Sequence, residues 1–187
     1  MTTTTTLARA CATGLLALSS SLAHAVDWQP DAFTVKAGIG EHNSVMAGGG
    51  LRWDWDFQRM RRKSELTAHT EVMLNEWRAE RPDHSGYRLY TQVVVLPSLR
   101  MRLDRGASPW FLEFGIGLSW MSHKFETPDK QFSTEWNFYD VLGVGYTFGG
   151  AQGKHEVDLR LVHFSNAGLR DPNPGLNFVQ VRYTREF

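Results

Sequence analysis

The chain lacks three features that would simplify its classification: paired cysteines, a long apolar run and an excess of charge of one sign. Its 187 residues include one cysteine, Cys11, so no disulfide can form within the chain. No run of 18 or more apolar residues follows the first 25, which excludes a transmembrane helix from that part of the sequence. Acidic and basic residues number 20 each, and this balance gives no electrostatic support for a nucleic-acid partner.

The first 25 residues have the pattern of a secretory signal peptide. One charged residue, Arg9, precedes the short apolar run GLLALSSSLA, and a small-x-small site ends at Ala25. The alternative interpretation is a frayed N-terminal helix. We expect residues 1–25 to be removed and residues 26–187 to form one domain without cysteine. Such an exported chain must be held together by backbone hydrogen bonds and packing.

From Phe33 onward, apolar residues alternate with polar or small ones. The alternating segments are about ten residues long, the length of a tilted strand that crosses a bilayer. Eight segments can be distinguished, at about 33–41, 45–57, 64–77, 87–103, 110–121, 138–148, 155–166 and 177–187. A soluble sandwich or a lipocalin-like barrel would show the same alternation with the apolar face turned inward.

Three features favour an all-β fold in the form of an eight-stranded antiparallel transmembrane β-barrel. The apolar face carries tryptophans near strand ends, where the aromatic girdle of a membrane barrel lies; they are Trp53, Trp55, Trp110 and Trp120. The opposite face mixes glycine with charges of both signs, which suits a narrow lumen filled by paired side chains. The terminal Phe187, preceded at alternate positions by Tyr183, Val181 and Val179, is similar to the C-terminal signature of bacterial outer-membrane barrels.

The inner face and the loops follow from this topology. With both ends of the barrel periplasmic, the external loops would lie at about 42–44, 78–86, 122–137 and 167–176. We expect the inward charges to pair into a plug rather than an ion path; they are Arg52, Asp54, Glu71, Arg88, Arg100, Arg102, Glu113, Asp158, Arg160 and Arg182. The histidines show no metal-ligand spacing, and neither a metal nor an organic cofactor is expected.

The seventh segment ends with two polar residues on its apolar face. Three apolar residues at alternate positions are followed on the same side by His163 and then Ser165. An unpaired polar group in hydrocarbon costs on the order of several kcal/mol, and less near the interface. An imidazole and a hydroxyl on one face form the base and nucleophile pair of acyl transfer, and the substrate would be a lipid beside the barrel wall. The alternative is that headgroups wet both residues at a strand end.

The stretch HFSNAGLRDPNPGL, with the signal peptide, the size and the eight segments, closely resembles the lipid A 3-O-deacylases of the Gram-negative outer membrane. The close match covers His163 to Asn177, and the rest matches in length and strand pattern only. The resemblance implies that His163 is the general base, that Ser165 takes the acyl group from the glucosamine 3-position and that Asn166 contributes to the oxyanion site. It also implies lipopolysaccharide as the substrate and an outer-membrane location. The sequence leaves open whether the chain forms a homodimer.

One position departs from the family pattern. The type member has a glutamate fourteen residues after the histidine, where this chain has Asn177. If strand pairing sets Ser165 opposite Asn177, the amide oxygen would still accept from the imidazole and fix its tautomer. A second candidate is Asp140, which a hairpin around Gly149–Lys154 would place directly across from His163. We predict that Asp140 orients His163, with Asn177 supporting; the alternative is that Asp140 is a strand cap in the headgroup layer.

The leading hypothesis is an outer-membrane esterase that hydrolyses the 3-linked acyl chain of lipid A. One alternative is a non-catalytic barrel for adhesion or anchoring, in which Asn177 marks a lost activity. Another is an acyltransferase that uses the same nucleophile with a different acceptor. A hydrogen bond between Ser165 and His163 would favour catalysis, although such sites can be loose before the substrate binds.

Overall fold

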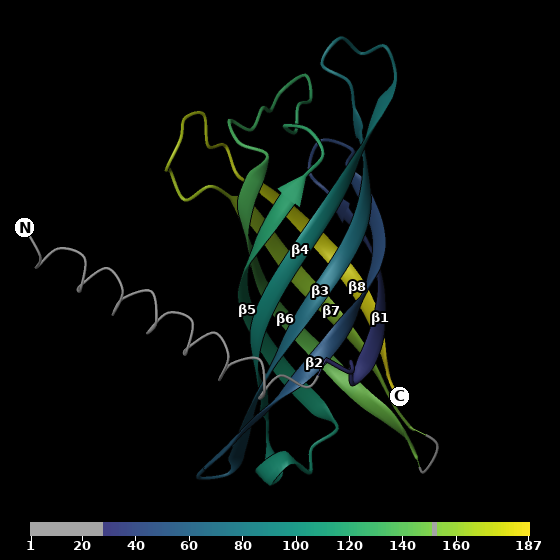
Figure 1. Ribbon diagram of the computed structural model, residues 1–187, viewed down its shortest axis with the longest axis vertical. Helices are drawn as coiled ribbons and strands as arrows, with labels where there is room; N and C mark the ends of the chain where they lie inside the picture. Colours follow the sequence, from purple (N-terminus) through teal and green to yellow (C-terminus); the bar gives the residue numbers. More distant parts are fainter. Residues whose placement is uncertain (1–27, 151–152) are drawn as a thin grey trace, which may run out of the picture.

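The computed structural model describes residues 28–150 and 153–187, so the expected signal peptide, residues 1–25, lies outside the described part. The described chain forms one closed antiparallel barrel in which each strand pairs with its sequence neighbours and β1 pairs with β8 (Figure 1). The elements are β1 (Ala32–Gly40), β2 (Val45–Arg61), β3 (Ser64–Glu80), β4 (Tyr87–Arg102), the 3-10 helix η1 (Asp104–Gly106), β5 (Trp110–Met121), β6 (Trp136–Gly150), β7 (Gly153–Ser165) and β8 (Leu176–Glu186). The eight-stranded barrel predicted from the alternation is confirmed.

The loops that follow β1, β3, β5 and β7 lie together at one end of the barrel, and the turn after β2 and helix η1 lie at the other (Figure 1). This arrangement agrees with the external loops expected from the sequence. Within residues 28–150 and 153–187, no helix is long and apolar enough to cross a membrane.

Strands β2 and β3 are longer than the alternation indicated. Strand β2 ends at Arg61 and β3 begins at Ser64, so the basic turn between them contains only two residues. The pairing of β2 with β3 shifts between Asp54 and Gln58, which marks a bulge or irregularity. A bulge sets extra residues against the partner strand, and beyond Asp54 every side chain of β2 is exposed whatever its polarity. The pattern that identifies strands is therefore lost there.

The outer wall of the barrel is apolar on all eight strands. On β7, Leu159 and Leu161 are 48% and 57% exposed, while the charged residues between and before them, Asp158 and Arg160, are buried. Exposed tryptophans also lie at or next to strand ends, namely Trp110, Trp120 and Trp136, while Trp55 is exposed within β2. A soluble sandwich or barrel would bury the apolar face, so this polarity excludes both. An apolar band around a closed barrel is stable in hydrocarbon.

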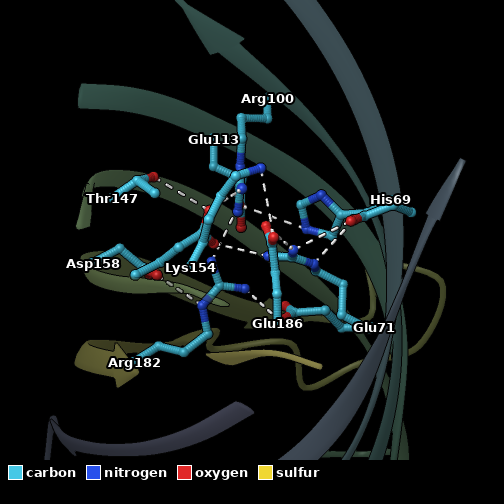
Figure 2. Close-up of polar contacts among 12 residues, drawn as sticks. His69, Glu71, Arg100, Glu113, Thr147, Lys154, Asp158, Arg182 and Glu186 are labelled. Atoms are coloured by element: carbon cyan, nitrogen blue, oxygen red, sulfur yellow. Dashed lines mark hydrogen bonds and ion pairs between the residues drawn. The ribbon is translucent and has the colours of Figure 1, made fainter. Parts of the chain in front are cut away.

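A network of paired charges fills the lumen (Figure 2). Arg160 and Arg182 each bind the same three buried carboxylates, Glu71, Glu113 and Asp158. Buried charges are tolerated only when they are paired and hydrogen-bonded. These contacts confirm the polar plug predicted for the lumen.

A second group of charges surrounds Glu156. Its carboxylate oxygens lie 2.7–3.0 Å from nitrogens of Arg52, Arg100 and Arg102. Two of the residues predicted for the plug lie toward its ends instead: the side chain of Asp54 is 46% exposed, and that of Arg88 is 40% exposed beside Glu126. The plug therefore occupies the middle of the barrel rather than its whole length.

Toward the external loops, the interior becomes aromatic. The ring of Trp77 lies 4.7 Å, centroid to centroid, from the rings of both Phe164 and Phe178, and all three are buried. Phe164 belongs to β7 and Phe178 to β8. Because side chains alternate along a strand, their neighbours His163 and Asn177 must face outward, toward lipid. The buried aromatic cluster thus fixes which side of the wall carries the polar residues.

Pairing across β6, β7 and β8 sets the neighbours of His163. On the β6 side Asp140 is its direct partner, as the hairpin count predicted. On the β8 side His163 pairs with Asn177, and this corrects the register that would have set Ser165 opposite Asn177. Both registers keep the same residues on the lipid face, so alternation cannot distinguish them. The folding of the loop at 166–175 decides between them.

The lumen network makes a stability prediction. Glu113 binds three buried guanidinium groups, those of Arg100, Arg160 and Arg182. We expect Glu113→Gln to lower the free energy of unfolding by about 3–5 kcal/mol, because these cations lose a counter-charge. Urea unfolding in lipid vesicles, followed by tryptophan fluorescence, measures this change. The matched control, Glu135→Gln in the β5–β6 loop, should change stability by less than about 0.5 kcal/mol. Equal stability of the two variants would contradict the prediction.

Candidate active site

A row of polar residues crosses three neighbouring strand ends on the outer wall. His163 lies on β7, its pairing partner Asn177 lies on β8, and Glu41 directly follows β1. The pairing of β1 with β8 reaches Gly40 opposite Phe178, and the backbone N–H of Glu41 donates to the carbonyl of Asn177 at 3.2 Å. Backbone pairing on both sides of Asn177 therefore holds the row in place.

The imidazole of His163 is held from two directions. Its Nδ1 lies 2.7 Å from Oδ1 of Asn177. An amide oxygen only accepts hydrogen bonds, so Nδ1 carries the hydrogen and Nε2 keeps a free lone pair. The ring also packs against Gly175, where a Cβ atom would lie 2.8 Å from Cε1 of His163. With φ of 64°, Gly175 has a backbone conformation that favours glycine, and the absence of a side chain leaves room for the ring.

Ser165 lies on the same half-buried face, two residues beyond His163 and opposite Phe138 of β6. Among the described residues its hydroxyl has no hydrogen-bond partner, and none joins it to His163. Residues i and i+2 of a strand begin about 7 Å apart. The two groups predicted to react are therefore neighbours on one face, and the hydrogen bond sought from the sequence is not formed in the described chain.

Asp140 lies opposite His163, but the imidazole bonds to the other side. Within residues 28–150 and 153–187, no hydrogen bond or ion pair involves the carboxylate of Asp140. Directly opposite residues of an antiparallel pair have Cβ atoms about 5 Å apart, so its charge is close to the ring. The positions expected for Asp140 and Asn177 are thus both beside His163, and Asn177 is the one bonded to it.

Asn166 is buried, and its side chain organises the loop after β7. Its Nδ2 donates to the carbonyl oxygen of Arg170 at 2.7 Å and to Oγ of Ser133 at 2.9 Å, and its Oδ1 accepts from the backbone N–H of Gly168 at 3.0 Å. Both amide hydrogens are therefore engaged within the protein. Donation to an oxyanion, as expected from the sequence, requires one of these bonds to open.

A groove on the outer wall begins at the polar row. It has a volume of about 500 Å³, with His163 and Asn177 at one end and Ile39, Leu161 and Val179 along its length. These three apolar side chains come from β1, β7 and β8 and are all exposed. The groove is open to the lipid side, and its size and apolar lining suit a hydrocarbon chain.

Glu41 was not identified as a site residue from the sequence. Its Oε1 accepts from Nδ2 of Asn177 at 2.8 Å, and its Oε2 accepts from Nζ of Lys130 at 2.7 Å. These hydrogen bonds, that of Lys130 first, lower the pKa of Glu41 to about 2. Glu41 and Asn177 are 136 residues apart. No local motif connects them, and only the closure of the barrel brings them together.

One cluster in the lumen has the donor types of a metal site. Atoms of His69, Glu71 and Glu113 lie within 4.8 Å of one another. Both carboxylates already bind the guanidinium groups of Arg160 and Arg182, and Figure 2 shows Arg182 beside them. A cation would have to compete with these fixed positive charges, so we assign the cluster to the structural ion network.

Comparison with known proteins connects this geometry to one family. The sequence model described as Lipid A 3-O-deacylase (PagL) matches residues 47–185, a range that includes all five site residues predicted from the sequence. The chain is 29% identical over 176 residues to the lipid A deacylase PagL of Bordetella bronchiseptica, covering 92% of each chain. It is 27% identical over 135 residues to the lipid A deacylase PagL of Pseudomonas aeruginosa, covering 72% of this chain and 73% of the relative.

A solved structure supports the fold. The crystal structure of the outer membrane enzyme PagL superposes with a TM-score of 0.71 at 24% identity, covering 83% of this chain and 99% of that chain.

The bond between His163 and Asn177 makes a prediction about which neighbour orients the ring. We expect Asn177→Ala to lower kcat roughly 100-fold, because His163 loses the acceptor that fixes its tautomer. Asp140→Asn should have a smaller effect, since the carboxylate makes no hydrogen bond to the ring. Release of fatty acid from lipid A in detergent measures both rates. A larger loss in Asp140→Asn than in Asn177→Ala would restore the order predicted from the sequence.

Proposed function

This chain belongs to the lipid A 3-O-deacylase family, and we propose that His163 and Ser165 carry out its reaction on the lipid-facing wall of the barrel. The chain is a carboxylic ester hydrolase of the Gram-negative outer membrane that acts on the 3-linked acyl chain of lipid A. The observation that carries the proposed mechanism is the bond from Nδ1 of His163 to Asn177, which leaves Nε2 free to act as a base on the face where lipid lies.

The proposed reaction has two steps. Oγ of Ser165 attacks the ester carbonyl carbon while Nε2 of His163 takes the hydroxyl proton. The bond between the carbonyl carbon and the sugar oxygen then breaks, and His163 returns the proton to that oxygen. A water molecule next attacks the acyl-serine with His163 again as base, which releases the fatty acid and restores Ser165. Attack requires Oγ of Ser165 to turn toward Nε2, a contact that belongs to the complex with substrate.

Asn166 organises the loop that follows β7. Its amide joins Ser133 and the backbone of Arg170, and these bonds hold the loop beside Ser165. The oxyanion that develops on the substrate needs a hydrogen-bond donor near the reacting carbon. Asn166 supplies that donor if Nδ2 releases one of its two partners as the substrate binds. We propose this exchange as its catalytic role, with loop positioning as its role before binding.

The groove gives the substrate a direction. The acyl chain would lie along Ile39, Leu161 and Val179, with its ester end at His163 and the sugar near the external loops. Burial of apolar chain against these side chains supplies binding energy away from the reacting ester. All of these residues come from one chain, so the mechanism does not require a homodimer.

Two alternatives differ from the proposal in a measurable way. A barrel for adhesion or anchoring would leave lipid A unchanged, and membership of a deacylase family argues against it. An acyltransferase would form the same acyl-serine but pass the chain to another lipid. The products, free fatty acid or a newly acylated lipid, distinguish hydrolysis from transfer.

The first prediction from this mechanism concerns the two reacting groups. Mass spectrometry of lipid A incubated with the wild-type protein should show loss of one 3-linked acyl chain. Ser165→Ala and His163→Ala should each lower the rate by at least about 1,000-fold, because nucleophile and base act as a unit. The matched control is Ser85→Ala in the β3–β4 loop, which should retain the wild-type rate. Deacylation by Ser165→Ala at the rate of the control would contradict the assignment of the nucleophile.

A second prediction concerns the groove. We expect Val179→Trp to raise KM for lipid A about tenfold or more, because the indole would occupy the path of the acyl chain and remove on the order of 1–2 kcal/mol of apolar contact. Leu112→Trp, at a similarly exposed position on β5, adds the same side chain to a different part of the wall. Steady-state kinetics in mixed micelles compares them. Identical kinetics of the two variants would show that the chain binds elsewhere.

A further inference from the structure

We propose that Glu41 is a positioning residue for the deacylation reaction, acting on His163 through the side chain of Asn177. The proposal rests on the role of His163 given above. A carboxylate beside a functional histidine would fix its tautomer and stabilise the imidazolium, and the partner of His163 on β8 is instead an amide, that of Asn177. The structure assigns the missing negative charge to a different strand end, one residue beyond β1, with the amide of Asn177 between the charge and the ring.

The contacts form a continuous row. Nδ1 of His163 meets Oδ1 of Asn177 at 2.7 Å, and Nδ2 of Asn177 donates to Oε1 of Glu41 at 2.8 Å. The backbone N–H of Asn177 lies 3.4 Å from Oε2 of Glu41, the same oxygen that accepts from Lys130 at 2.7 Å. Four side chains from β7, β8 and two external loops therefore share one hydrogen-bonded line along the wall.

The carboxylate of Glu41 determines which way the amide of Asn177 points. An ionised carboxylate only accepts hydrogen bonds, so Asn177 must present its NH₂ group to Glu41. Its oxygen then faces His163, where it accepts the hydrogen of Nδ1. Without the carboxylate, the amide is free to turn over and present NH₂ to the ring, which would stabilise the tautomer with its hydrogen on Nε2. In that tautomer Nε2, the proposed base, carries the hydrogen and has no free lone pair.

Glu41 keeps its negative charge down to low pH. Hydrogen bonds from Lys130 and Asn177 lower the pKa of Glu41 to about 2, so the group is ionised wherever a neutral imidazole can act as a base. A negative charge beyond Asn177 favours the imidazolium that forms during each step. Lys130 is 14% exposed and opposes this effect, so the row carries both a negative and a positive group.

Other charged groups surround the row on every side. Asp140 faces His163 from β6 and is present in the variants as well as in the wild type. His42, the residue after Glu41, lies 3.6 Å from Asp129 in the β5–β6 loop. The side chain of Glu41 takes part in neither of these contacts, so Glu41→Gln removes neither of them directly. A shift produced by Glu41→Gln can therefore be attributed to the loss of its charge.

The location of Glu41 explains why no sequence motif identifies it. It lies outside residues 47–185, the range matched by the family, and it reaches the site only because β1 closes the barrel against β8. Asn177 on β8 thus accepts the hydrogen of the imidazole, and Glu41 after β1 supplies the negative charge.

The test compares two variants that break the same ion pair, Glu41→Gln and Lys130→Gln. Glu41→Gln should lower kcat roughly 10–100-fold with little change in KM, as expected for loss of an outer partner of a functional histidine. It should also move the acid limb of the pH–rate profile to lower pH, because the imidazolium loses a nearby negative charge. Lys130→Gln should move the acid limb to higher pH. A role in loop structure alone would give both variants the same loss and no opposite shifts.

The matched control is Glu80→Gln. Glu80 is an external carboxylate bonded to Nδ1 of another histidine, His84, at 2.7 Å, and it is remote from the groove. We expect wild-type kinetics from this variant. If Glu41→Gln also shows wild-type kinetics and an unmoved acid limb, the proposal is overturned while the deacylase mechanism stands. If wild-type protein releases no fatty acid, the proposed function fails first, and the role of Glu41 with it.

The same substitution in an Asn177→Glu background gives an independent test. There a carboxylate would contact His163 directly, and Glu41 would no longer be needed. Glu41→Gln should then change kcat by less than about twofold, against a loss of roughly 10–100-fold in the native background. An equal loss in both backgrounds would assign Glu41 to loop folding and overturn the proposal.

A measurement without turnover tests the step on which the proposal depends. The ¹⁵N chemical shifts of the imidazole nitrogens in detergent micelles report which nitrogen carries the hydrogen. We expect the wild-type protein to hold His163 with the hydrogen on Nδ1 and Glu41→Gln to populate both tautomers. The same tautomer in both proteins would overturn the proposal.

Discussion

The closed hydrogen-bonded ring is the constraint on which the rest of this structure depends. Hydrocarbon offers no partners for backbone N–H and C=O groups, so strands in a bilayer must pair on both edges, and β1 must meet β8. With eight strands the ring is narrow and its interior must be filled by side chains. Charges therefore lie inside, where Arg160 and Arg182 share three carboxylates, and apolar residues lie outside.

A site on the outside of such a wall is limited in what it can contain. Every polar side chain there loses water unless it lies near the headgroups, so each must be bonded to a neighbour or engaged with substrate. His163 and Asn177 satisfy each other at the external end of their strands. Ser165 lies at the end of β7, and its hydroxyl bonds to no residue of the described chain. The rings of Phe164 and Phe178 pack against each other inside the barrel. Because side chains alternate along a strand, the neighbouring residues of the polar row must point outward.

The sequence predicts the parts of this structure that depend on local spacing. Alternation identifies the eight strands, the charged lumen and the outward direction of His163. The tight hairpin between β6 and β7 has few residues to count, so the pairing of Asp140 with His163 was predicted correctly. The register considered for β7 and β8, with Ser165 opposite Asn177, differs from the observed one by two residues, because the loop between these strands is long and its length does not set its folding. Glu41 was missed for a stronger reason, since it reaches the site only through ring closure.

Ring closure also explains how the amide of Asn177 can be supported by a carboxylate that is distant in the sequence. In a barrel each strand has a neighbour on both sides, so a residue on β8 can be assisted from β1 as well as from β7. Asn177 uses both: it accepts from His163 on one side and donates to Glu41 on the other. The negative charge therefore lies one strand farther from the imidazole than Asn177 does. Nδ1 of His163 still donates to an oxygen acceptor. The interaction with the imidazolium weakens with that distance, while the control of the tautomer does not.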